Sequence, residues 1–95
     1  MWKQEKTESL FQRLAADFFQ TVSNGTSLIT ITACRLSPDG KHAAIVISVL
    51  PAAETPLAYE FAKRQLHDLR DYIRARARVH RIPRFDISLA LTQTQ

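Results

Sequence analysis

Apolar residues recur at helical spacing near the start of the chain and alternate with polar residues in several later segments. Positions three or four apart share one helix face, and alternate positions share one strand face, so the two spacings predict different elements. Lys3–Asn24 has the helical spacing, and Ser23–Gly25 predicts its end, because glycine adopts the left-handed conformation beyond a helix at little cost. The expected buried face of this helix comprises Leu10, Phe11, Leu14, Ala15, Phe18, Phe19 and Val22.

Two strands joined by a tight turn are predicted in the middle of the chain. Leu28–Leu36 is rich in β-branched residues, which favour strands. Ser37–Gly40 has the sequence SPDG, which is typical of a turn, so Lys41–Leu50 is expected to return as the second strand of a hairpin. Both faces of this second strand are apolar, which predicts a central position in the sheet.

A second helix and a third strand complete the predicted set of elements. The helix is expected over Pro56–His80, with Thr55 as its cap and Pro83 as the stop signal. Apolar and polar residues then alternate over Arg84–Leu91, which predicts the third strand, with Phe85, Ile87, Leu89 and Leu91 on one face.

The apolar face of the second helix is interrupted near the end of the helix. Ala62, Leu66, Leu69, Tyr72 and Ile73 form the expected core face. At about 100° per residue, Arg76 would point into the same face as Leu69. The helix is therefore expected to bend, unwind or leave the core by that point.

The order helix-strand-strand-helix-strand predicts an α+β fold with both helices on one face of a three-stranded mixed sheet. Crossover connections are nearly always right-handed, so the third strand should lie parallel to the second, on the side away from the first. The predicted core comprises Phe11, Phe18, Ile45, Ile47, Leu66, Leu69, Ile73 and Ile87.

Length and composition predict one domain over residues 1–95, because 95 residues can build one core and little more. The only cysteine, Cys34, excludes an internal disulfide framework and lies in an apolar run, as a buried inert thiol would. We find no apolar run typical of a signal peptide or a membrane span. We therefore expect a cytoplasmic protein that does not contact membranes.

Positive charge is concentrated in the last third of the chain. Residues 1–62 contain five Lys and Arg against six Asp and Glu, a balance of −1, whereas residues 63–95 contain eight against three, a balance of +5. On a continuous helix, Lys63, Arg70, Arg74, Arg78 and Arg81 would fall within one polar arc. A solvated helix face usually mixes both signs, and arginine grips phosphates bidentately, so we favour a nucleic-acid contact over a merely solvated face. The predicted RNA-binding residues are Lys63, Arg70, Arg74, Arg76, Arg78, Arg81 and Arg84.

The sequence offers no constellation for catalysis. The chain has only two glycines, Gly25 and Gly40, so it contains neither a phosphate-binding loop nor a dinucleotide-binding fingerprint. The histidines and Cys34 lack metal-ligand spacing, and Asp39 is better explained as a turn residue than as a catalytic acid. We therefore predict no enzymatic activity, no metal, no cofactor and no small-molecule substrate.

Several short motifs, in their order and spacing, resemble the ribosome-binding factor A family. The strand before Ser37 and Asp39, and the apolar strand that follows them, match the family's Ser-x-Asp turn. Tyr72-Ile73-Arg74 matches the start of the family's arginine-rich segment, and Arg81-Ile82-Pro83, followed by Phe85, matches the start of its last strand. The resemblance covers residues 8–91.

The resemblance implies a type II KH-like fold and a non-enzymatic role as a bacterial assembly factor. Members of this family bind the small ribosomal subunit and its 16S rRNA and support rRNA processing. The implied partners are this subunit and its rRNA, and the free protein is expected to be a monomer. The family's Ala-x-Gly kink is absent, since Leu69-Arg70-Asp71 occupies that place. We therefore expect an unbroken helix from Pro56 to at least Arg74.

Two other classes of function stay open at this point. The same fold could serve a protein-interaction module or a structural subunit of a ribonucleoprotein complex. A small enzyme is a third class, for which the sequence offers no residues. Occupancy distinguishes the first two, because an assembly factor leaves its precursor particle and a structural subunit stays in mature particles.

Overall fold

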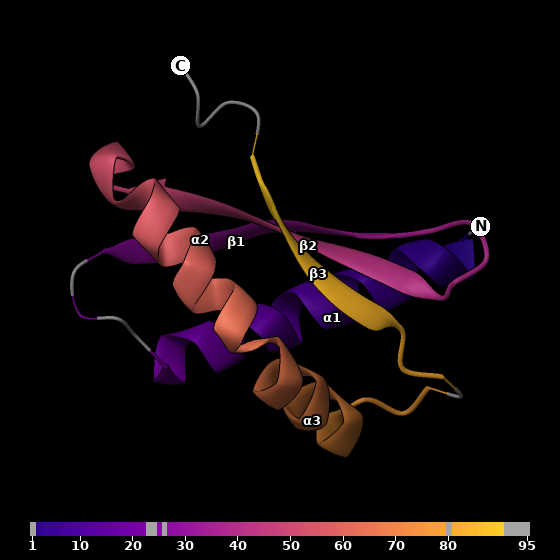
Figure 1. Ribbon diagram of the computed structural model, residues 1–95. Coiled ribbons are helices and arrows are strands. Elements are labelled where there is room, and N and C mark those ends of the chain that lie inside the picture. The colour runs from indigo at the N-terminus through magenta and orange to yellow at the C-terminus, as the bar shows by residue number, and fades with distance from the viewer. Residues whose placement is uncertain (1, 23–24, 26, 80, 91–95) are drawn as a thin grey trace.

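The computed structural model describes residues 2–22, 25, 27–79 and 81–90, with side chains from Lys6 onward (Figure 1). Its elements are α1 (Trp2–Thr21), β1 (Leu28–Leu36), β2 (His42–Leu50), the short 3-10 helix η1 (Ala52–Glu54), α2 (Thr55–Arg64), α3 (Leu66–Arg76) and β3 (Arg84–Leu89).

The three strands form one mixed sheet in the order β1-β2-β3. β1 is antiparallel to β2, and β3 is parallel to β2, as the sequence predicted. α1 packs against β1, α2 against β2 and β3, and α3 against α1 and β3, so the helices cover the sheet face whose side chains are buried. Seven of the eight predicted core residues are buried, namely Phe11, Phe18, Ile45, Ile47, Leu69, Ile73 and Ile87, and Leu66 is half-buried against them.

A β-bulge at Thr32 changes the phase of β1. Ile31 pairs with Ile47 but Ala33 already pairs with Val46, so Thr32 is the extra residue. Before the bulge Ile31 faces the core, and after it Cys34 does. Because side chains alternate along a strand, one extra residue is what allows both to be buried.

α1 also covers the outer edge of β1 with two polar side chains one turn apart. Glu8 accepts a hydrogen bond from the Leu36 amide at 2.6 Å, and the Gln12 amide donates to the Thr32 carbonyl at 3.3 Å. Edge strands present unpaired backbone groups that can pair with other chains. These two contacts occupy part of that edge.

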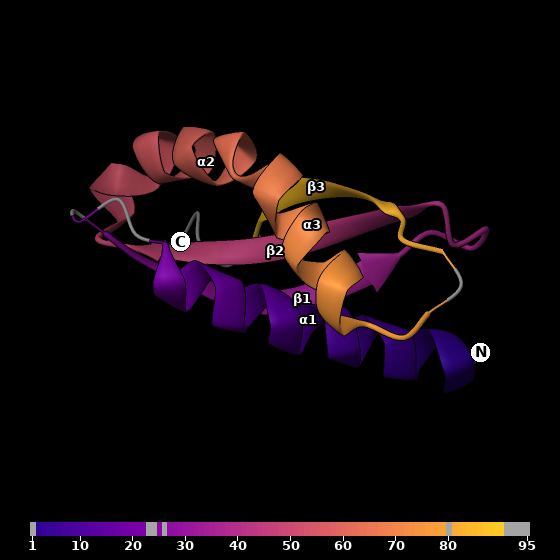
Figure 2. The ribbon, with the colours of Figure 1, turned by 90° about the horizontal axis from the view of Figure 1, so that it is seen from below.

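The predicted unbroken second helix is wrong. The helix divides at Gln65, whose N–H bonds to the Ala62 carbonyl three residues back at 3.0 Å. Leu69–Asp71, which occupies the place of the family's kink, is helical. α2 lies on β2 and β3 through the small residues Ala58 and Ala62, and α3 turns away towards α1 (Figure 2). A straight helix could not follow both surfaces, so packing decides the direction of the chain here.

Several element ends differ from the prediction by a few residues. α1 ends at Thr21, and the predicted end Asn24 lies outside the described residues. Thr55 does not cap α2, because it is already helical and its hydroxyl donates to the Ala52 carbonyl at 2.6 Å. α3 ends at Arg76, the residue by which the helix was expected to bend, unwind or leave the core.

The last strand is shorter than predicted. β3 ends at Leu89, which is 38% exposed rather than buried, and Leu91 lies outside the described residues. Within the ranges given above, no helix combines the length and the apolar character that crossing a membrane requires.

Candidate nucleic-acid interface

The seven predicted RNA-binding residues lie on four pieces of backbone. The break at Gln65 and the helix end at Arg76 disrupt the predicted polar arc, which is therefore wrong as a single helical feature. α2 carries Lys63, α3 carries Arg70, Arg74 and Arg76, the connection to β3 carries Arg78 and Arg81, and β3 begins with Arg84; all seven side chains are exposed.

The connection between α3 and β3 holds its exposed arginines between apolar residues that pack against the core. Ala77 is extended, with φ −87° and ψ 137°, and its N–H closes the last turn of α3 on the Ile73 carbonyl. Ala77, Val79 and Ile82 pack against the core, and Pro83 is buried. The exposed side chains of Arg78 and Arg81 lie between these apolar anchors, so the backbone fixes them on the solvent side.

We call Arg74, Arg78, Arg81 and Arg84 the arginine cluster. Among the residues that the structure describes, none of the four forms an ion pair with a carboxylate. Arg74 lies in the last turn of α3, where positive charge also complements the helix dipole. The cluster is thus a group of exposed cations at the end of α3 and the start of β3, free to meet an external anion.

Arg76 and Lys63 differ from the cluster because each lies over an aromatic ring of its own helix. The Arg76 guanidinium carbon is 3.7 Å from the centre of the Tyr72 ring, and its Nη1 donates to the Tyr72 carbonyl at 3.3 Å. The Lys63 ammonium is 5.1 Å from the centre of the Tyr59 ring. Both pairs have the i, i+4 spacing of neighbours on one helix face.

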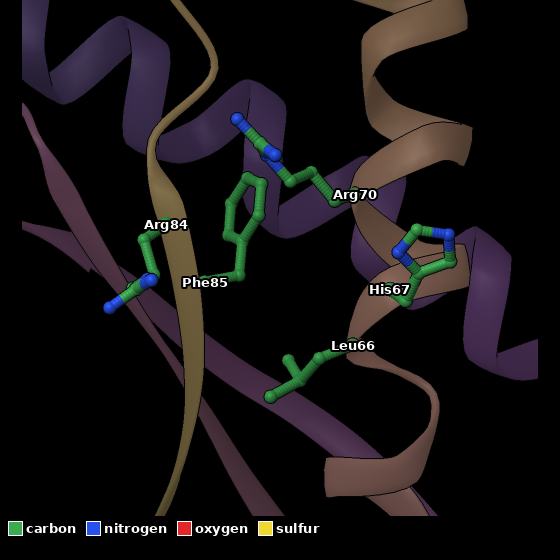
Figure 3. Close-up of a pocket in the computed structure, with 5 residues that line it drawn as sticks. All are labelled: Leu66, His67, Arg70, Arg84 and Phe85. Atoms are coloured by element: carbon green, nitrogen blue, oxygen red, sulfur yellow. The ribbon is translucent and has the colours of Figure 1, made fainter.

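A groove of about 280 Å³ separates α3 from β3, lined by Leu66, His67, Arg70, Arg84 and Phe85. Figure 3 shows the Phe85 ring projecting from β3 towards α3 and the Arg70 side chain extending towards that ring. The Arg84 side chain leaves β3 in the direction away from α3. The groove thus has an apolar floor of Leu66 and Phe85, and Arg70 lies at its rim.

Sequence reasoning missed three of these lining residues, namely Leu66, His67 and Phe85. Leu66 was assigned to the core and Phe85 to one face of the third strand, and His67 was considered only as a metal ligand. The spacing of His67 and Arg70 on one helix face was a signal in the sequence. Their position beside β3 was not, because the crossover brings distant segments together.

His67, Asp68 and Asp71 also gather on α3. Their ligand atoms lie within 4.8 Å of one another, and His67 Nε2 is 3.5 Å from Asp71 Oδ2. All three side chains are exposed, and exposed acidic groups commonly gather without an ion. We assign no metal to them.

Two residues with altered acidity have structural roles. Ser37 donates to Asp39 at 2.6 Å and the Lys41 amide donates at 3.0 Å, and these two bonds lower the pKa of Asp39. Burial, followed by the charge of Glu8, raises the pKa of the Cys34 thiol to about 12. The first group shapes the β1–β2 turn and the second lies in the core, as the sequence predicted for both.

Comparison with solved structures identifies the fold. A crystal structure of ribosome-binding factor A from Thermus thermophilus superimposes with a TM-score of 0.82, covering 90% of this chain and 93% of that one at 24% identity. The chain has the fold of ribosome-binding factor A. This match confirms the predicted KH-like α+β class.

Two further structures support the same fold. The solution structure of a putative ribosome binding factor A from Thermotoga maritima matches with a TM-score of 0.76 and 23% identity, over 90% of this chain and 85% of that one. A homology model of the Thermus thermophilus factor has been fitted into a cryo-EM map of a 30S complex. It matches with a TM-score of 0.65 and 24% identity, over 83% of this chain and 86% of that one. No protein-family model matches the chain, and no curated protein matches it.

Proposed function

We propose that this protein is a non-catalytic assembly factor that binds the rRNA of the small ribosomal subunit through the arginine cluster. The observation that carries the proposal is the cluster itself: four exposed arginines without carboxylate partners among the described residues. The shared fold supports the choice of partner, because one protein with this fold has been fitted into a map of a 30S complex.

The chemistry of the cluster favours phosphate contacts. Arginine presents a planar set of donors that matches phosphate oxygens, and such contacts position a protein without selecting a sequence. Selectivity would then come from the shape of the folded rRNA. A role in maturation of 16S rRNA and a cytoplasmic location belong to the same proposal.

Charge reversal within the cluster tests the proposal. Four phosphate contacts predict a slope of about −3 for the logarithm of affinity against the logarithm of salt concentration. Arg74→Glu with Arg78→Glu should abolish most small-subunit binding and flatten this slope. Thermal melts should change little, because substitution of exposed charges usually alters stability by less than ~0.5 kcal/mol each.

A matched control carries the same change in charge elsewhere. Arg13→Glu with Arg64→Glu alters two exposed arginines on α1 and α2, outside the cluster. This variant should bind small subunits nearly as well as the wild type. An equal loss of small-subunit binding in both double variants, or no loss in either, would contradict the proposed site.

A structural subunit of a ribonucleoprotein complex is the second candidate. Three exposed leucines favour it, since Leu28, Leu50 and Leu57 are 61%, 63% and 66% exposed and could contact another protein. Sucrose-gradient sedimentation of the tagged protein separates the two roles. An assembly factor is expected with free small subunits and precursors, and a structural subunit with translating particles.

A further inference from the structure

The Arg76 and Tyr72 pair is a layered group at the end of α3. A guanidinium carbon 3.7 Å from the ring centre is in van der Waals contact with the ring face. The hydrogen bond from Nη1 to the Tyr72 carbonyl holds the same group from its edge. Two contacts therefore hold the guanidinium over the ring.

The ring beneath it is fixed in turn by the core. Tyr72 is half-buried, and its ring meets the Phe18 ring of α1 edge-on, with 5.4 Å between the centres. Phe18 is itself 5% exposed. The layers thus run from the core through Tyr72 to Arg76, whose side chain is exposed to solvent.

We propose that Arg76, supported by Tyr72, is a stacking platform for an unpaired RNA base. The inference rests on the proposed function, and it assigns to Arg76 a different contact from the phosphate contacts of the arginine cluster. Unpaired bases commonly stack on arginine planes and on aromatic rings, and every base has a face suited to it. A guanidinium already held over a ring loses less freedom when a base covers its outer side than an unsupported one would.

Lys63 shows why this role belongs to Arg76. It has the same spacing from Tyr59, but its ammonium is a point charge at 5.1 Å from the ring centre and has no plane to offer. The two pairs differ in the chemistry of the cation, so a lysine at position 76 should keep the charge and lose the platform.

Three labelled RNA oligomers test the platform by fluorescence anisotropy. They are an oligoadenylate, an oligouridylate and an abasic ribose-phosphate strand, each about twelve nucleotides long, with equal charge and different stacking strength. The wild type should bind the adenylate strand roughly tenfold more tightly than the abasic strand. Arg76→Lys should reduce that ratio to about one and leave the salt slope of the abasic strand unchanged.

Two further variants separate stacking from general effects. Arg81→Lys alters an arginine of the cluster that lies over no ring among the described residues, and it should preserve the adenylate preference. Tyr72→Phe keeps the supporting ring and should also preserve the adenylate preference. Circular dichroism checks that α3 is intact in each variant.

Three outcomes would overturn the platform, and a fourth would overturn the proposed function. Equal wild-type affinity for all three strands, an unchanged preference in Arg76→Lys, or a wild type that binds small subunits but no oligomer would overturn the platform. If the wild type binds neither the oligomers nor small subunits, the proposed function itself fails.

Discussion

Asp39 illustrates how one side chain closes the β1–β2 turn. Its carboxylate accepts from the Ser37 hydroxyl and the Lys41 amide, while Gly40 adopts a φ of +73°. Both bonds favour the ionised form, which is why the pKa of Asp39 falls below its ordinary value of 3.8. The turn is therefore coupled to the protonation of one exposed residue.

Substitution of Asp39 should have an effect that depends on pH. The folded pKa lies below the unfolded one, so the ionised carboxylate stabilises the fold above about pH 4, and this contribution is lost as the pH falls through the folded pKa. Asp39→Asn should lower the melting temperature at pH 7 by more than it does near pH 2. An equal deficit at both pH values would show that ionisation is irrelevant to the turn.

Cys34 should make stability depend on alkaline pH in the opposite direction. Its pKa rises from 9.0 to about 12 in the folded state, so the unfolded chain releases the thiol proton first. Stability from this group is complete below about pH 9 and is lost as the pH rises towards about 12. Urea unfolding of the wild type and Cys34→Ala across this range should show the extra loss in the wild type alone; parallel curves would contradict it.

At the scale of elements, packing overrules local pattern in two places. The bulge at Thr32 lets both halves of β1 face the helices, and the break at Gln65 lets α2 and α3 follow different surfaces. In each case a single residue absorbs the change of direction. The central strand β2 needs no such adjustment, because its alternation buries Ala43, Ile45, Ile47 and Val49 throughout.

Truncation of Ile47 tests the packing of β2. The side chain is fully buried, so Ile47→Ala should cost about 2–5 kcal/mol through lost transfer energy and a cavity. Ser48→Ala, at the next position on the opposite face, is the matched control and should cost much less. Urea denaturation measures both. An Ile47→Ala variant that unfolds like the wild type would disprove this facing of the strand.

Removal of Glu8 tests the covered edge of β1. Glu8→Ala leaves the Leu36 amide without its carboxylate, and hydrogen bonds to charged groups contribute about 1.5–3 kcal/mol. We expect a loss of about 1–2 kcal/mol in urea denaturation, since the bond is only partly buried. Asp17→Ala, an exposed acidic residue on the same helix, controls for helix charge and should change stability by less than ~0.5 kcal/mol. Equal effects would mean that the edge contact contributes nothing.

At the scale of the whole molecule, charged and apolar surfaces lie at opposite ends of the sheet. His42, at the start of β2, pairs with Arg84, and Leu50, at its end, pairs with Leu28. The nine residues of β2 span about 26 Å. That distance exceeds the screening length of about 10 Å at 0.1 M salt, so the two ends act independently on an external charge.

Two variants of equal net charge exploit this separation. The net charge of +4 becomes +3 in Arg78→Ala, by loss of one cation, and also +3 in Leu50→Glu, by gain of one anion. Only Arg78→Ala should weaken small-subunit binding and reduce the salt slope by about 0.7–0.9. Similar losses in both would show that binding responds to total charge and not to the arginine cluster.

The sequence alone determined the strands, the β1–β2 turn, the strand order and most of the core. These depend on alternation within short segments and on residues such as Gly40 whose backbone preference is local. It also determined that positive charge gathers after Lys63, because net charge is a property of the sequence itself.

Only the tertiary structure decided how that charge is arranged. The bend at Gln65 and the end of α3 at Arg76 separate residues that one helix would have aligned. Packing of Ala77, Val79 and Ile82 then fixes the exposed arginines between them, and the crossover brings α3 beside β3 to form the groove. Such features depend on contacts between residues distant in the chain, and local patterns carry no record of those contacts.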